Sequence, residues 1–189
     1  MIFHDTGVAD AWIVEPEKFG DDRGFFARVC DVDEFAERGM TTEVVQASLS
    51  FSNRAGTVRG MHWTVPPATE SKYIRAVRGA VLDVIVDLRP WSTTYLRRVE
   101  VELTSENRLA IYVPPWFAHG HQTLEDDSEL LYMMGDRYSP ELERGAPHDD
   151  PVVGHGWPLP VSIVSARDRS WPTFDDDTNR AEMGRDPRP

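Results

Sequence analysis

The sequence contains little cysteine and little lysine. Its single cysteine, Cys30, excludes a disulfide framework and a thiolate metal site. Lys18 and Lys72 are the only lysines, and the other eighteen of the 20 basic residues are arginines. A lysine ammonium is a compact charge whose pKa moves readily on burial, whereas a guanidinium stays charged. Lys72, which lies in an apolar segment, is therefore a candidate for a chemical role.

Long hydrophobic runs are also missing. No run approaches the 18 apolar residues from which a membrane-spanning helix is inferred, so we expect no membrane partner. The first ten residues, MIFHDTGVAD, lack the basic and apolar regions of a signal peptide, so we expect a cytoplasmic protein. A length of 189 residues is typical of one domain.

Positive charge is in the minority. The chain has 32 acidic and 20 basic residues and a formal net charge of −12. Binding to nucleic acid needs a basic surface, so we do not expect nucleic acid as a partner. A few arginines in a cleft are still enough to bind one small anionic ligand.

Short segments rich in Val, Ile, Tyr and Trp alternate with turn residues over the first 160 residues. This spacing predicts an all-β fold, either an antiparallel sandwich or a barrel. The expected strands cover 11–14, 24–30, 41–50, 56–63, 73–77, 80–88, 96–103, 109–113, 119–124 and 129–134, with a tight turn at 78–79.

Few segments have a helical pattern. Asp33 to Arg38, ended by Gly39, predicts one short helix, and 165–169 predicts a turn or a second one. The chain after residue 175 is polar, with acidic residues and proline, which predicts a frayed end. We therefore expect one domain over 1–175 and a polar tail over 176–189.

The densest chemical motif is Arg59-Gly-Met-His62-Trp, which Lys72 follows ten residues after the histidine. A histidine and a lysine on neighbouring strands suggest a base beside a charge that stabilises an oxyanion. The alternative is a surface histidine and an unrelated lysine, because such groupings also arise without function.

A series of blocks in order carries a family resemblance. They are Asp22-Arg-Gly-Phe-Phe26, Arg59-Gly-Met-His62, Lys72, Arg78-Gly-Ala-Val-Leu-Asp-Val-Ile-Val-Asp-Leu-Arg89, Val113-Pro-Pro-Trp-Phe-Ala-His-Gly120, Leu131-Tyr132, Tyr138-Ser-Pro140, Trp157-Pro158 and Ser165-Ala-Arg-Asp168. Together they resemble the dTDP-4-dehydrorhamnose 3,5-epimerase family over about four-fifths of the chain. The resemblance implies a cupin or jelly-roll fold, a double-stranded β-helix with few helices.

The resemblance also implies an activity. The family epimerises a nucleoside-diphosphate 4-keto-6-deoxy sugar at C3, at C5 or at both, without a cofactor and as a homodimer. His62 matches the base, Asp168 the carboxylate that orients its imidazole, Lys72 the cation near the sugar O4, and Tyr132 the acid on the opposite face. A second set matches substrate-binding residues: Arg23, Phe26, Gln46, Ser48, Arg59, His119, Tyr138, Glu143 and Arg167.

The chain departs from the family pattern at several positions. Arg28 replaces the usual glutamate that helps to hold the base, and Gln46-Ala47-Ser48 replaces Gln-Asp-Asn. Thr64 replaces a glutamine, and His121 replaces the aromatic that usually follows His-Gly. The departures concern the nucleotide set more than the catalytic set, which favours a related epimerase with a different nucleotide or sugar.

Two alternatives stay open at this point. One is an epimerase that acts at a single carbon, and the other is a metal-dependent or non-catalytic sugar-binding cupin. A metal site would have to combine His62 with His119 and His121, but cupin metal sites place His-x-His and a glutamate on the earlier strand. We therefore expect no metal. Asp83 and Asp87 are expected at the solvent side, at strand ends, or paired with arginines.

Overall fold

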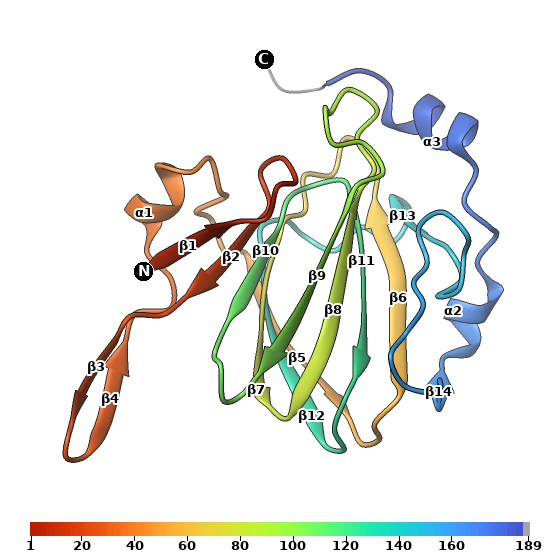
Figure 1. The fold of residues 1–189 in the computed structure, drawn as a ribbon. Helices are drawn as coiled ribbons and strands as arrows, with labels where there is room; N and C mark the ends of the chain where they lie inside the picture. The colour runs from red at the N-terminus through yellow and green to blue at the C-terminus, as the bar shows by residue number, and fades with distance from the viewer. Residues whose placement is uncertain (187–189) are drawn as a thin grey trace.

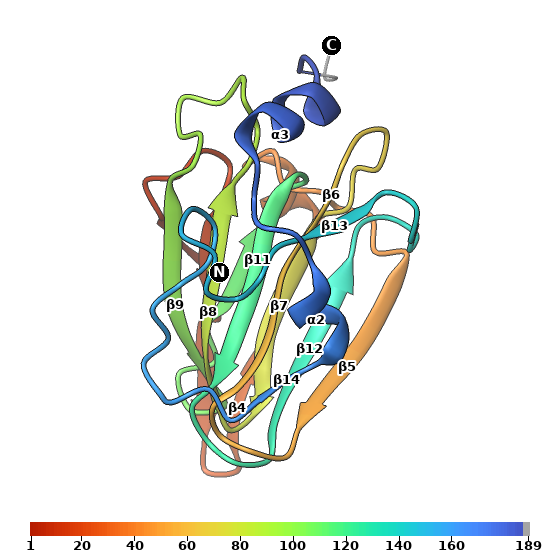
Figure 2. The ribbon, with the colours of Figure 1, turned by 90° about the vertical axis from the view of Figure 1, so that its right-hand side faces the viewer.

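The computed structural model describes residues 1–186 and consists of two antiparallel sheets packed face to face (Figures 1 and 2). One sheet has the order β1-β2-β10-β7-β12-β5, and the other β13-β6-β11-β8-β9, with β14 parallel to β6. This arrangement confirms the predicted all-β jelly roll of the cupin type with a few short helices.

The strands of the first sheet are β1 (Ile2–Asp5), β2 (Trp12–Glu15), β5 (Gln46–Ser52), β7 (Lys72–Arg78), β10 (Ala110–Val113) and β12 (Ser128–Met134). Those of the second are β6 (Thr57–Thr64), β8 (Ala80–Asp87), β9 (Arg98–Thr104), β11 (Phe117–Thr123), β13 (Glu143–Gly145) and β14 (Ile163–Val164). A separate hairpin is formed by β3 (Lys18–Asp21) and β4 (Gly24–Ala27), and the helices are α1 (Val32–Ala36), α2 (Ala166–Ser170) and α3 (Asp176–Met183).

The burial of each strand follows its place in the sheet. β9 is an edge strand, and its residues alternate between exposed and buried. β8 lies between β9 and β11, and nearly all its residues are buried. Ile74, Ile85, Phe117 and Leu130 meet in one core between the two sheets. Gly79 makes the predicted turn between β7 and β8 with φ of 67°, a conformation that favours glycine.

The end of the chain corrects the prediction of a frayed segment. Residues 176–183 form α3, whose N-cap Asp175 accepts a hydrogen bond from the Thr178 backbone N–H. Met183 packs in a hydrophobic cluster with Trp63 and Val86. The helix buries only two residues. It therefore needs few apolar positions, and its sequence shows little of the apolar periodicity by which a helix is predicted. Residues 187–189 of the predicted tail lie outside the described residues.

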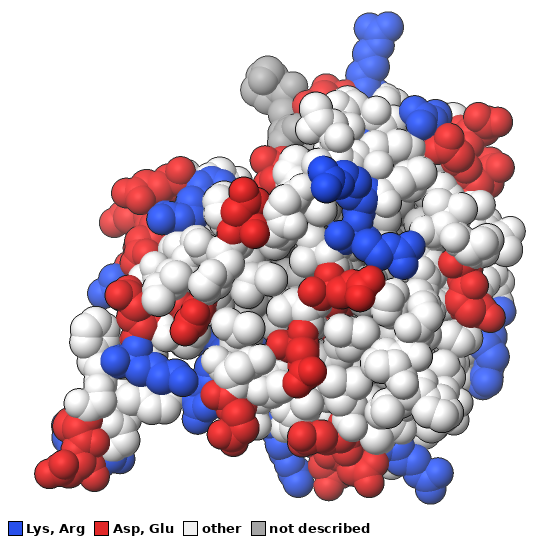
Figure 3. All heavy atoms as spheres, viewed as in Figure 1, with Lys and Arg blue, Asp and Glu red and all other residues white. Residues whose placement is uncertain are grey.

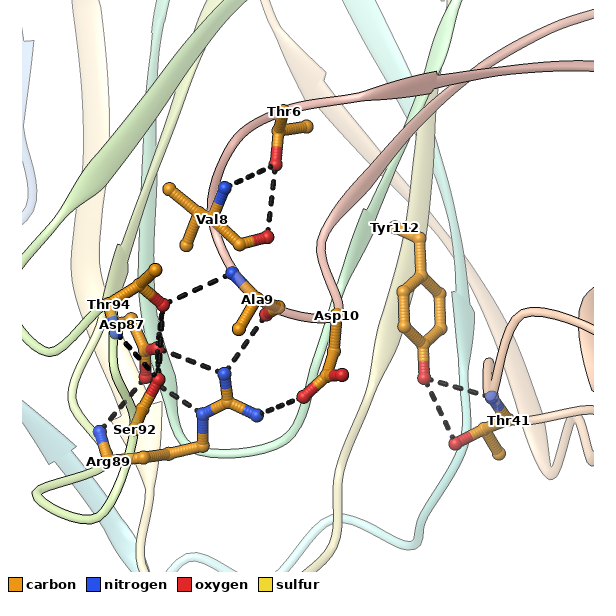
Figure 4. Close-up of polar contacts among 10 residues, drawn as sticks. All are labelled: Thr6, Val8, Ala9, Asp10, Thr41, Asp87, Arg89, Ser92, Thr94 and Tyr112. Carbon is orange, nitrogen blue, oxygen red and sulfur yellow. Dashed lines mark hydrogen bonds and ion pairs between the residues drawn. The ribbon is translucent and has the colours of Figure 1, made fainter.

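Asp87 is fully buried at the end of β8 and pairs with an arginine, which confirms two of the three alternatives expected for it (Figure 4). Arg89 Nε and Nη2 donate to the two Asp87 carboxylate oxygens at 2.8 and 2.9 Å. The same guanidinium reaches Asp10 Oδ2 at 2.6 Å and the Ala9 carbonyl at 3.0 Å. Because each guanidinium nitrogen has a hydrogen-bond partner, this buried charge ties the β1–β2 loop to the sheet that contains β8.

Acidic and basic side chains are interspersed on the face shown in Figure 3, and no continuous basic area lies among the described residues there. The hairpin β3–β4 projects away from the two sheets (Figure 1). None of the helices among residues 1–186 is long and apolar enough to cross a membrane.

Candidate active site

A cavity of about 540 Å³ opens between the two sheets. Residues of β6 and β11 line one wall, and residues of β7 and β12 line the other. Segment 163–168, which includes β14 and the start of α2, completes the rim. The lining residues are Thr57, Val58, Arg59, His62, Lys72, His119, His121, Tyr132, Ile163, Ser165, Arg167 and Asp168. All four residues assigned to catalysis from the sequence are therefore brought together.

His62 and Asp168 form a hydrogen-bonded pair at this cavity. His62 Nε2 lies 2.7 Å from Asp168 Oδ1, and the Asp168 side chain is almost fully buried. Ser165 Oγ caps α2 by accepting from the Asp168 backbone N–H at 2.9 Å, which fixes the carboxylate beside β6. Burial by itself would raise the pKa of Asp168, but the hydrogen bond and charge of His62, with smaller contributions from Gly60 and Ser165, lower it below its usual value.

Lys72 begins β7, and its side chain is largely buried. Its ammonium makes a short ion pair with Glu70, whose side chain is also buried. Glu70 was not predicted to be a site residue. The sequence feature that could have indicated Glu70 is its place two residues before Lys72. This spacing puts both side chains on one side of an extended segment.

Tyr132 lies on β12, and its side chain packs between the sheets. Its hydroxyl is 3.4 Å from His121 Nδ1, and its ring makes an edge contact with His119. Burial is the main cause that raises the pKa of Tyr132 above its usual value; the charge of Asp83 raises it further, and Arg59 lowers it. The phenol is therefore protonated at neutral pH.

A second histidine–carboxylate pair includes His119, which lines the cavity, and Asp83, which does not. His119 Nε2 is 2.9 Å from Asp83 Oδ2, and both side chains are buried. Asp83 is fully buried in β8, which corrects the expectation that it lies at the solvent side, at a strand end or beside an arginine. Burial lowers the pKa of His121 well below its usual value, and the neighbouring charges of His119, Arg59 and His62 lower it further, so its imidazole is neutral.

Three other predicted binding residues lie on β5 and β6. The Arg59 guanidinium donates to Ser52 Oγ at 3.2 Å and to the Phe51 carbonyl at 2.9 Å, and the side chain lines the cavity. Ser48 lies opposite Tyr132 in the β5–β12 register, so both point to the inner face of the sheet. Gln46 donates to Ser48 Oγ at 2.9 Å from the same face. Neither Gln46 nor Ser48 is among the cavity-lining residues.

Glu143, Tyr138 and Arg167 form a polar group beside the rim. The Arg167 guanidinium donates to Glu143 Oε2 at 2.7 Å, and the Tyr138 hydroxyl donates to the same oxygen at 3.0 Å. This carboxylate is the main cause that raises the pKa of Arg167. Of the three, Arg167 alone lines the cavity.

Arg23 and Phe26 are not brought to the cavity of their own chain. Both belong to the projecting β3–β4 hairpin (Figure 1), where Arg23 pairs with Asp21 and Phe26 is 75% exposed. Phe19 and Phe25 of the same hairpin are also exposed, so the hairpin displays an apolar surface that its own sheets do not cover.

Comparisons with known proteins agree with this geometry. The family model of dTDP-4-dehydrorhamnose 3,5-epimerase matches residues 5–176. A dTDP-4-dehydrorhamnose 3,5-epimerase of Sinorhizobium fredii is 38% identical over 92% of this chain and 90% of its own length. A dTDP-4-dehydrorhamnose 3-epimerase of Streptomyces niveus is also 38% identical, over 89% of this chain and 82% of its own length.

A solved structure has the same fold. It is a dTDP-6-deoxy-D-glucose-3,5-epimerase from Legionella pneumophila in complex with dTDP-4-keto-L-rhamnose. The TM-score is 0.85 and the sequence identity is 32%, with 96% of each chain covered.

Proposed function

We propose a mechanism for this chain, which belongs to the dTDP-4-dehydrorhamnose 3,5-epimerase family. The family model and the relatives both show this membership. It is an isomerase that acts on a nucleotide sugar. The finer proposal is that it inverts C3, C5 or both of a nucleoside-diphosphate 4-keto-6-deoxy sugar. One observation carries the mechanism: His62 and Tyr132 face the same cavity from opposite sheets.

Inversion next to a ketone needs a base on one face of the sugar and an acid on the other. The C4 carbonyl acidifies the hydrogens at C3 and C5, so their removal leaves an enolate with charge on O4. We assign His62 as the base, because its imidazole lines the cavity and is held at one nitrogen by Asp168. The carboxylate stabilises the imidazolium that forms when the proton is taken up.

The enolate oxygen needs a positive group in a site with little water. Lys72 projects into the cavity from the wall opposite His62, and Glu70 fixes the position of its ammonium. A fixed charge of this kind stabilises the developing oxyanion without reorganising during the reaction. The ion pair with Glu70 also lets the ammonium lie buried, because the charge is compensated before the substrate binds.

Tyr132 is assigned as the acid that returns a proton to the opposite face. Its phenol is protonated at neutral pH, as the raised pKa requires. Transfer of its proton to the ring carbon leaves a phenolate, which is stabilised by the positive charge of Arg59. The phenolate then takes a proton from solvent and the His62 imidazolium gives its proton to solvent, which restores both groups for the next turnover.

The nucleotide and the inverted carbon are a further part of the proposal. Arg59, His119 and Arg167 line the cavity and are assigned to the diphosphate and sugar, and Gln46, Ser48, Tyr138 and Glu143 are assigned to the more distant part of the substrate. A panel of dTDP-, CDP-, GDP- and UDP-4-keto-6-deoxy sugars, incubated with enzyme in deuterated water, tests this directly. Deuterium at C3, at C5 or at both identifies the inverted carbons, and no uptake from any member contradicts the function.

We also propose a homodimer in which Arg23 and Phe26 of one subunit reach the site of its partner. The projecting hairpin with its exposed phenylalanines supports this, because an uncovered apolar surface gains by burial in a symmetric interface. A cytoplasmic location stays a prediction.

Subunit mixing tests the shared site. Arg23→Ala and His62→Asn chains, each inactive alone, should regain partial activity when combined, because a mixed dimer contains one site with both residues intact. No recovery after verified subunit exchange would show that each site is built within one subunit.

A further inference from the structure

Asp83, His119 and His121 form a buried cluster that the proposed reaction does not fully use. His121 lies directly opposite Asp83 in the β11–β8 register, and His119 is two residues along the same strand. Residues two apart in a strand share a face, and so do directly opposed residues. The three side chains therefore point to one place by sheet geometry alone. At most 6% of any of the three is exposed.

The donor atoms of this cluster already converge. One ligand atom of each residue lies within 4.8 Å of the others. In a tetrahedral site with bonds of about 2.1 Å, two donors lie about 3.4 Å apart, so side-chain rotation has to close at most about 1.4 Å.

One carboxylate oxygen of Asp83 is buried and unpaired. Its Oδ2 pairs with His119, but its Oδ1 is buried without any hydrogen-bond partner. A buried carboxylate oxygen is costly to leave unpaired, and such an atom calls for a ligand or an ion. The neighbouring imidazoles of His119 and His121 supply nitrogen donors beside it.

From these observations we propose that Asp83, His119 and His121 bind one divalent transition-metal ion on the cavity wall. Two imidazoles and one carboxylate are a donor set that suits Zn²⁺, Co²⁺ or Fe²⁺. The fourth position faces the cavity, because His119 and His121 both line it, and a water molecule completes the shell. A neutral imidazole binds an ion through the ring nitrogen that carries no proton, so a proton held between His119 Nε2 and Asp83 moves to the other nitrogen of the ring as the ion binds.

The ligands differ from those that the sequence pattern had suggested. His62 is held by Asp168 and stays available as the base, while Asp83 takes the third position. The ion would share His119 with the proposed substrate-binding set, but neither the base His62 nor the acid Tyr132 is a ligand, and no step of the proposed mechanism uses an ion. The two hypotheses can fail separately.

Binding of Zn²⁺ and Co²⁺ to chelator-treated protein tests the site. Calorimetry with Zn²⁺ should give one site per chain, and Co²⁺ should develop the visible absorption of a site with few ligands. His121→Phe replaces one donor with the residue type usual in the family at this position, so the fold should tolerate it. Loss of outer-shell partners alone weakens metal sites by about 10- to 100-fold, so loss of this ligand should weaken binding at least about 100-fold.

His4→Gln is the matched control. His4 is an exposed histidine that also faces a carboxylate, Glu15, at 3.0 Å, so it reports adventitious surface binding. The proposal expects unchanged affinity in this variant. X-ray absorption of the Zn²⁺-loaded wild type, which should show two imidazole ligands, gives a measure that does not depend on any variant folding. No saturable binding, equal affinity in His121→Phe, or a spectrum without imidazole would overturn the proposal.

Discussion

His62 Nε2 lies 2.7 Å from Asp168 Oδ1, although 106 positions separate the two residues in the sequence. The imidazole comes from β6 and the carboxylate from the first turn of α2. The pair exists only because the last part of the chain returns to β6, where β14 adds a parallel strand just before the helix. The orientation of the proposed base thus depends on the packing of the C-terminal segment.

Asp168→Asn should lower the rate of exchange while leaving substrate binding nearly intact. An asparagine keeps the shape but cannot stabilise an imidazolium, and its amide can select the wrong tautomer. We expect a loss of about 10²-fold or more in kcat, with a small change in KM. Asp149→Asn, at an exposed aspartate beside the partly buried His148, is the control. An unchanged kcat in Asp168→Asn would remove the carboxylate from the mechanism.

The same carboxylate predicts a pH dependence of stability. The pKa of Asp168 is lower in the folded chain than the value of about 3.9 expected in the unfolded chain. The ionised form therefore stabilises the fold above about pH 4, and this contribution is lost as the pH falls through the lower folded-state pKa. Denaturant unfolding of wild type and Asp168→Asn at several pH values measures it. A stability gap between them that grows below pH 4 would contradict the assignment.

Tyr132→Phe should separate proton removal from inversion. His62 still abstracts a proton, so deuterium exchange on its own face persists, whereas epimerised product falls sharply because the opposite donor is gone. Mass spectrometry and NMR of the sugar measure the two outcomes separately. Tyr95→Phe, which removes a hydroxyl that is hydrogen-bonded to α3 and does not line the cavity, is the control. Normal yields of inverted product from Tyr132→Phe would refute the acid assignment.

Lys72→Arg should be poorly tolerated, although arginine serves at nearly every other basic position of the chain. The guanidinium is larger than an ammonium and cannot present one compact charge between Glu70 and the sugar O4. Steady-state kinetics should show a reduced kcat, while Lys18→Arg, at the other lysine, behaves as wild type. Near-normal turnover in Lys72→Arg would mean that only the positive charge matters.

Much of the fold could be predicted from the sequence because its strands have a clear local signal. Runs such as Ala80–Asp87 are rich in β-branched residues and bounded by turns. α3 was missed because a helix that buries only Asn179 and Met183 has almost no apolar pattern. The roles of Asp83 and Glu70 were missed for a related reason, since a carboxylate in a strand has the same sequence signal whether it is buried against a partner or exposed.

The residues of the site also fall into some that could be placed from the sequence and some that could not. The family resemblance placed His62 and Tyr132 in one site because their blocks are specific, and both line the same cavity. Arg23 and Phe26 could be assigned by resemblance, but one chain alone does not bring them to the cavity. In the homodimer that we propose, they lie at the partner's site, and no local sequence pattern encodes such an assembly.

The central claim is that His62 is the base, and His62→Asn tests it most directly. The measurement is deuterium uptake at C3 and C5 of a 4-keto-6-deoxy nucleotide sugar that the wild type accepts, with nucleotide-sugar binding followed in parallel. His4→Asn serves as the control for loss of a histidine outside the cavity. The account predicts that uptake at both carbons falls by about 10²- to 10⁴-fold while binding is largely retained. Uptake within a factor of a few of wild type would contradict it.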